Sequence, residues 1–141
     1  MINKITHIAI AVNNFNNLDS WRALLGKKCK EKRYVSISQD VDALVFFNDK
    51  INIEFIKPRS PKSPISNFLK KNKFGGVHHL SFEVENLEKD LKKIKSKNIR
   101  TITRGSESKG IKKNKICFLN PIDLNGVLVE LEEKKVRNDN R

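Results

Sequence analysis

Hydrophobic and polar residues alternate in two similar phrases of this chain. Residues 5–12 read Ile-Thr-His-Ile-Ala-Ile-Ala-Val, and residues 77–84 read Val-His-His-Leu-Ser-Phe-Glu-Val. A period of two is typical of a half-buried β-strand, because successive side chains point to opposite faces. Each phrase has a histidine near its start, His7 or His79, and precedes a segment with apolar residues at helical spacing. The repetition indicates a fold built by duplicating one unit.

The patterns along the chain predict a βαβββ order for both halves. The first unit, 4–58, is expected to contain a helix at 15–25 and strands at 4–12, 29–37, 41–48 and 51–57. The second unit, 76–132, is expected to contain a helix at 86–97 and strands at 77–84, 99–103, 114–119 and 126–132. A linker, 59–75, contains a short helix at 64–72 that Ser63 caps, and a charged tail, 133–141, follows the second unit. The predicted fold class is α+β: one domain, 1–141, in which two tandem βαβββ units form a paired half-barrel around a cavity.

Two glutamates recur at matching places in the two halves. Ile53-Glu54-Phe55 closes the first unit, and Val129-Glu130-Leu131 closes the second. Strand parity puts both glutamates and both histidines on the less apolar face, which is expected to line the cavity. Buried imidazoles and carboxylates are costly unless they are paired or bind a metal. Two of each form a mixed nitrogen–oxygen set that suits a divalent Zn, Co, Ni, Mn or Fe ion.

Each of these residues also has an ordinary interpretation. A single strand histidine is more often a surface or hydrogen-bonded residue than a ligand, and a single strand glutamate more often faces solvent. Because the same pair recurs in both halves, we favour a metal site formed by His7, Glu54, His79 and Glu130. His78 points to the other face by parity, so we expect it to be structural or to support a ligand.

Charge and composition limit which binding partners and which cellular location are expected for this chain. The formal net charge is +13, but the lysines are scattered among acidic residues, and one Trp and one Tyr offer little stacking surface for bases. We therefore expect no nucleic-acid partner, and a small anionic substrate instead. No stretch reaches the length of a membrane span and the N-terminus lacks a signal-like apolar run, which predicts a cytoplasmic protein with no membrane partner. Cys29 and Cys117 are expected to be reduced thiols.

The chain resembles the vicinal oxygen chelate superfamily, which includes glyoxalase I, methylmalonyl-CoA epimerase, extradiol dioxygenases and bleomycin- and fosfomycin-resistance proteins. The resemblance covers residues 4–133, and within the superfamily the chain is most similar to the methylmalonyl-CoA epimerases. The phrases that support it are Ile5-Thr6-His7-Ile8-Ala9-Ile10-Ala11-Val12, Ile53-Glu54-Phe55-Ile56-Lys57-Pro58, Ser63-Pro64-Ile65, Gly75-Gly76-Val77-His78-His79 and Gly126-Val127-Leu128-Val129-Glu130-Leu131.

The resemblance implies a glyoxalase-like fold with metal ligands at His7, Glu54, His79 and Glu130. It also implies proton transfer at the carbon between a thioester and a carboxylate, through a metal-stabilised enediolate, with Glu130 as both ligand and base. The implied substrate is a CoA thioester, and relatives often form homodimers. An acidic residue that some members have on the third strand corresponds to Ala43 in our register, so the second acid/base residue is not assigned.

Three functions remain open from the sequence. The first is a metal-dependent epimerase or isomerase of an acyl-CoA. The second is a glyoxalase I-like lyase, which the same His and Glu positions would fit equally well. The third is a non-catalytic member that binds a ligand in the cavity. An iron-dependent dioxygenase is disfavoured because such sites usually have two histidines and one carboxylate, and here Glu54 is an additional candidate.

Overall fold

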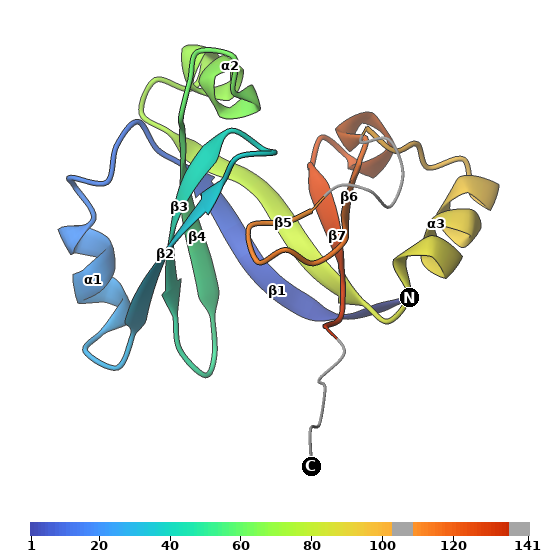
Figure 1. The fold of residues 1–141 in the computed structure, drawn as a ribbon, viewed down its shortest axis with the longest axis horizontal. Coiled ribbons are helices and arrows are strands. Elements are labelled where there is room, and N and C mark those ends of the chain that lie inside the picture. The colour runs from blue at the N-terminus through green and yellow to red at the C-terminus, as the bar shows by residue number, and fades with distance from the viewer. Residues whose placement is uncertain (103–108, 136–141) are drawn as a thin grey trace. The chain divides into compact units, whose positions relative to one another are not determined.

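The computed structural model describes residues 1–102 and 109–135, and the chain divides into two compact units (Figure 1). One unit is Thr6–Leu80, and the other combines Met1–Ile5 with the residues from Ser81 onward. Strands β1 (Ile2–Ala11) and β5 (Gly76–Val84) each run through both units. The end of the predicted strand 99–103 and most of the predicted tail 133–141 lie outside the described residues.

The Thr6–Leu80 unit has the predicted βαβββ order followed by the linker helix. After β1 come α1 (Asp19–Leu25), β2 (Lys30–Ser36), β3 (Val41–Phe47), β4 (Asn52–Pro58) and α2 (Pro64–Lys71). The strands lie in the order β2-β3-β4-β1-β5, with β1 parallel to β4 and both of the β2–β3 and β3–β4 pairs antiparallel. The predicted cap of the linker helix is confirmed, because Ser63 Oγ accepts a hydrogen bond from Ile65 N at 3.3 Å.

The other unit contains the remaining described elements. Its described elements after β5 are α3 (Leu87–Ser96), β6 (Ile116–Leu119), a short 3₁₀ helix, η2 (Pro121–Leu124), and β7 (Val129–Glu133). The strand order is β5-β7-β6, and β6 pairs antiparallel with β7. Asn86, which the prediction placed in the helix, is instead its N-cap and accepts from Lys89 N at 2.8 Å.

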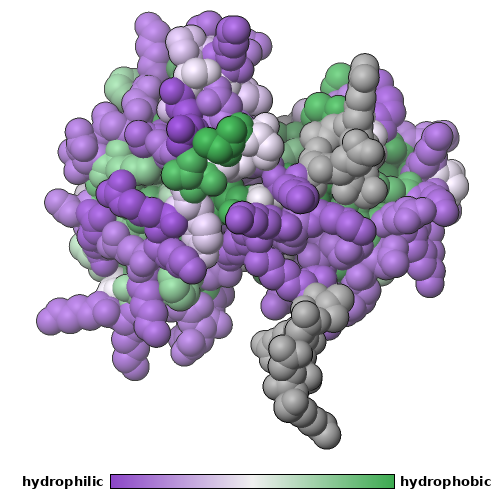
Figure 2. All heavy atoms as spheres, viewed as in Figure 1, coloured by the Kyte–Doolittle hydropathy of each residue, from purple (hydrophilic) through white to green (hydrophobic). Residues whose placement is uncertain are grey.

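Each unit has its own hydrophobic core. In Thr6–Leu80 the buried core residues are Ile10, Leu18, Leu44, Phe46, Ile53 and Phe55. In the other unit they are Val84, Leu87, Ile94, Cys117, Leu119, Val129 and Leu131. Full burial of a side chain such as Phe55 stabilises the fold by about 1.5–3 kcal/mol. Figure 2 shows mainly hydrophilic residues on one face of the molecule, as expected when the alternating apolar residues pack inward.

The structure corrects three predicted boundaries. The helix predicted at 15–25 begins at Asp19, because Asn14 Oδ1 accepts from Asn16 N at 2.9 Å and holds the preceding residues in a turn. The strand predicted at 126–132 begins at Val129, because Asn125 and Gly126 have positive φ and form a turn. The strand predicted at 114–119 begins at Ile116, after a turn in which Gly110 N donates to Asn114 O.

The strand predicted at 99–103 is reduced, within its described residues, to an isolated bridge. Thr101 pairs with Leu119 on β6. Ile102 N donates to Phe118 O at 2.8 Å, and Asn120 N donates to Arg100 O at 2.9 Å. The segment therefore lies beside β6, and its regular pairing is shorter than the predicted strand.

Candidate functional site

The parallel pairing of β1 with β4 positions two of the predicted site residues. Ala9 is the register partner of Glu54, and His7 lies two residues before Ala9 on the same face of β1. Ala9 and Ala11 are fully buried and small, so they leave space for larger polar side chains on this face. Asn52 Nδ2 donates to Thr6 O at 3.0 Å and ties the starts of the two strands together. The strand pattern thus brings His7 and Glu54 to one place.

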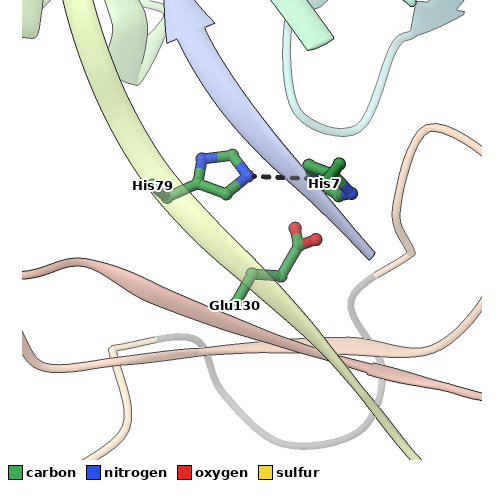
Figure 3. A group of neighbouring side chains, drawn as sticks. All are labelled: His7, His79 and Glu130. Atoms are coloured by element: carbon green, nitrogen blue, oxygen red, sulfur yellow. Dashed lines mark hydrogen bonds between the residues drawn. The ribbon is translucent and has the colours of Figure 1, made fainter. Parts of the chain in front are cut away.

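Three of the predicted ligands meet within the Thr6–Leu80 unit. His7 Nε2 lies 3.3 Å from Glu54 Oε2 and 3.4 Å from His79 Nε2. Figure 3 shows the two imidazoles, with the contact between their ring nitrogens as a dashed line. His7, Glu54 and His79 are 5%, 3% and 6% exposed, so all three polar groups are shielded from water. Such a buried cluster points to a ligand-binding role rather than to a solvated surface.

The other nitrogens of the two imidazoles also have polar neighbours. Thr6 Oγ1 lies 3.2 Å from His7 Nδ1, and His78 Nδ1 lies 2.9 Å from His79 Nδ1. The His78 ring meets Phe68 of α2 edge-on, with 5.0 Å between the ring centroids.

Burial keeps His78 and His79 neutral. It lowers the pKa of His79 well below the ordinary value of 6.5, and the nearby His7 and His78 lower it further. Burial also lowers the pKa of His78 to about 4. A neutral imidazole has the free lone pair that a metal ligand needs, so at neutral pH His79 is in its ligating form.

The two distances from His7 Nε2 are each compatible with a pair of atoms bound to one divalent metal ion. Two atoms bound to one zinc ion at about 2.1 Å, with a tetrahedral angle between the bonds, lie about 3.4 Å apart. The measured His7–His79 and His7–Glu54 separations of 3.4 and 3.3 Å match this value. Two ring nitrogens and a carboxylate oxygen form the donor set that zinc, cobalt, nickel, manganese and ferrous iron accept in proteins. The residues therefore fit a metal, whose identity the donor set does not fix.

Glu130, the fourth predicted ligand, lies in the other unit, on β7. Its side chain is 4% exposed, and Oε1 accepts a hydrogen bond from Ser81 Oγ at 2.8 Å. Ser81 Oγ also lies 3.4 Å from Glu132 Oε1. Figure 3 draws the Glu130 side chain as well. The carboxylate is thus buried and oriented by a hydroxyl from β5.

Sequence reasoning assigned no role to Thr6 and Ser81, which contact His7 and Glu130. Ser81 was recognisable only as a small polar residue on the same face of its strand as His79. Ala43, at the position that the register gave to the family's acidic residue, is fully buried. Its neighbour Asp42 pairs instead with Lys57 at 3.4 Å and Arg59 at 3.0 Å, which accounts for its carboxylate without a catalytic role.

Comparison with known proteins places this arrangement in a family. Residues 6–118 match the model of the glyoxalase/bleomycin resistance protein/dioxygenase superfamily. The chain belongs to this superfamily. The glyoxalase-like α+β fold and the family resemblance expected from the sequence are therefore confirmed.

Similar members of the superfamily are methylmalonyl-CoA epimerases, which are isomerases. The mitochondrial methylmalonyl-CoA epimerase of Dictyostelium discoideum is 36% identical over 134 residues, which cover 94% of this chain and 80% of the relative. The ethylmalonyl-CoA/methylmalonyl-CoA epimerase of Cereibacter sphaeroides is 33% identical and is covered over 99% of its length, against 94% of this chain. The methylmalonyl-CoA epimerase of Streptomyces coelicolor, solved as a variant in complex with 2-nitronate-propionyl-CoA, has 26% identity and a TM-score of 0.85, with coverage of 96% of this chain and 100% of the other.

The helices of this superfamily member are short. Over residues 1–102 and 109–135, none is long and apolar enough to cross a lipid bilayer.

Proposed function

We propose that this chain is a metal-dependent epimerase of methylmalonyl-CoA or a closely related malonyl thioester. The observation that supports this most directly is the buried cluster of His7, Glu54 and His79, in which His79 is neutral and His7 Nε2 lies 3.4 Å from His79 Nε2 and 3.3 Å from Glu54 Oε2. The epimerase relatives, similar over nearly the whole chain, supply the reaction class.

Glu130 is the fourth ligand in this proposal. The support is the internal repeat, in which Glu130 corresponds to Glu54, and the burial of its carboxylate against Ser81. Ser81 follows His79 by two residues in β5, so the two side chains lie on the same face of that strand. When bound, a divalent metal supplies Lewis-acid stabilisation of negative charge on substrate oxygens.

The protein's own contribution to the reaction is proton transfer. Glu130 takes the proton from the carbon between the thioester and the carboxylate, and Ser81 holds Glu130 in place through the hydrogen bond to Oε1. A second acid, which is not assigned to a residue, returns a proton to the opposite face of that carbon and completes the epimerisation. Glu130 and Ser81 are both buried, and the exclusion of water strengthens the hydrogen bond between them. The net charge of +13 favours an anionic substrate such as a CoA thioester over a neutral one.

Exchange of the substrate α-proton with solvent tests the proposal. Metal-loaded protein incubated with methylmalonyl-CoA in deuterated water should incorporate deuterium at the α-carbon, as followed by mass spectrometry. The chelated protein serves as the control and should incorporate much less. If the metal-loaded protein exchanges no α-proton in methylmalonyl-CoA or ethylmalonyl-CoA but converts the methylglyoxal–glutathione adduct, the glyoxalase-like alternative replaces this proposal.

We also propose a homodimer. The strand β2 is first in the strand order of its unit, and Val35 on it is 57% exposed, with Ile37 just beyond at 74%. Exposed apolar residues on an edge strand favour pairing with another chain. A single monomeric species in sedimentation velocity would contradict this. The cytoplasmic location stays a prediction of the sequence.

A further inference from the structure

Two adjacent histidines of β5, His78 and His79, contact each other through the Nδ1 atom of each ring. His78 Nδ1 lies 2.9 Å from His79 Nδ1, and the ring planes are inclined by 78°. Two imidazole nitrogens at this distance form a hydrogen bond only if one carries a proton and the other offers its lone pair. The contact therefore couples the proton positions of the two rings.

The two nitrogens of His79 have different surroundings. Nδ1 faces His78, whereas Nε2 lies 3.4 Å from His7 Nε2, and that His7 nitrogen lies 3.3 Å from Glu54 Oε2. A neutral imidazole has one N–H and one lone pair. If Nδ1 carries the proton, Nε2 has its lone pair on the side that faces His7.

The surrounding structure fixes the position of His78. Its ring packs edge-on against Phe68, which belongs to α2, and the start of α2 is fixed by the Ser63 cap. Gly75, just before β5, has φ +83°, and any side chain there would strike the carbonyl oxygen of Ala11. The chain can therefore pass this close to the end of β1 only with glycine, which sets where β5 and His78 begin.

We propose that His78 is a positioning residue that accepts a hydrogen bond from His79 Nδ1–H and so holds His79 in the tautomer whose Nε2 lone pair serves the metal. This inference rests on the metal site of the proposed function. It assigns His78 a role through His79, with no contact of its own to the metal or the substrate. Acceptors that fix the tautomer of a ligating histidine typically change metal affinity by about 10- to 100-fold when removed.

Two substitutions at one position separate this role from simple packing. His78→Asn keeps an acceptor oxygen close to the place of the imidazole Nδ1, whereas His78→Leu keeps an apolar body against Phe68 but has no acceptor. The metal affinity of each purified full-length variant is measured with Zn²⁺ and Co²⁺ against a competing chelator. Circular dichroism with a thermal melt confirms that each variant is folded.

The tautomer of His79 gives a second measurement that needs no metal. Long-range ¹H–¹⁵N correlation spectra of the chelated protein should show His79 protonated at Nδ1 in the wild type and in His78→Asn. In His78→Leu the population protonated at Nε2 should increase, because the acceptor that His78 offers to Nδ1 is gone. A structural role alone would leave the tautomer unchanged.

The expected result is metal binding about 10- to 100-fold weaker in His78→Leu and within about threefold of wild type in His78→Asn. Equal affinities in the wild type and in a folded His78→Leu variant would overturn the inference, as would a wild-type His79 protonated at Nε2. If His78→Leu does not fold, the spectra of wild type and His78→Asn still decide it. A wild type that binds neither metal removes the proposed metal site itself, which is a different outcome from an unchanged affinity in the variants.

Discussion

Glu130 is the single residue on which the proposed proton transfer depends most directly. Glu130→Gln keeps the size of the side chain and a partner for Ser81, but it removes the group that takes the proton. The α-proton exchange rate should fall by about 10²–10⁴-fold, the usual contribution of a positioned general base. The measurement is deuterium incorporation into methylmalonyl-CoA under saturating metal, so that any weaker metal binding is compensated.

A matched control is Glu88→Gln on the exposed face of α3. Glu88 forms a surface pair with Lys92, and both side chains are more than 70% exposed, at 73% and 78%. Removing this carboxylate should leave the exchange rate unchanged, because exposed pairs contribute little. An exchange rate in Glu130→Gln equal to that of Glu88→Gln would show that another group takes the proton.

At the level of elements, the hydrophobic pattern predicted the strands and helices correctly wherever burial of an apolar face decides the structure. The alternation around His7 and around Glu54 predicted both strands and the face of each side chain, because one face must pack on a core. The errors lie where local hydrogen bonds decide instead. Asn14 delays the first helix to Asp19 by a side-chain bond to the backbone, and hydrophobic spacing contains no signal for that.

The candidate site was predictable in its residue types but not in its supporting contacts. The repeat identified His7, Glu54 and His79, which the structure brings together. Strand parity put His78 on the opposite face, so the sequence predicted a structural or ligand-supporting role for it but not the direct contact with His79. Parity describes where a Cβ points, whereas a long aromatic side chain can turn at χ1 and χ2 and reach its neighbour.

The junction between α2 and β5 provides a test of how elements position the site. Gly75→Ala should lower the free energy of unfolding by about 2–4 kcal/mol, because positive φ strains alanine and its Cβ strikes the carbonyl oxygen of Ala11. It should also weaken metal binding, because β5 carries His79 and must shift to relieve the clash. Urea unfolding and chelator competition measure the two effects.

Gly26 is a matched control for this substitution. It has φ +80°, almost the same as Gly75, but a Cβ there would meet no atom within 4 Å. Gly26→Ala should therefore cost only the backbone strain, about 1–3 kcal/mol, without the added clash that Gly75→Ala meets. Equal losses of stability in the two variants would mean that the approach to Ala11 does not constrain the chain.

The whole molecule consists of two units, each with a separate core. Three of the proposed ligands belong to Thr6–Leu80, whereas Glu130 belongs to the unit that contains α3 and β7. The duplication accounts for this distribution, because each repeat supplies one histidine and one glutamate from strands in matching positions. A metal ion that binds all four would act as a cross-link between segments far apart in the sequence.

Metal binding should therefore stabilise the whole chain. At a free metal concentration about 100 times Kd, binding to the native state alone adds about 2.7 kcal/mol. For a chain of this size that raises Tm by about 5–10 °C, measurable by calorimetry with and without chelator. His79→Ala should abolish the shift.

Hydrogen exchange tests whether Glu130 is a ligand. Metal should slow the exchange of backbone amides in β1 and β4 and equally in β7. Slower exchange confined to Thr6–Leu80 would exclude Glu130 as a ligand, because a metal bound to Glu130 would protect the amides of β7 directly.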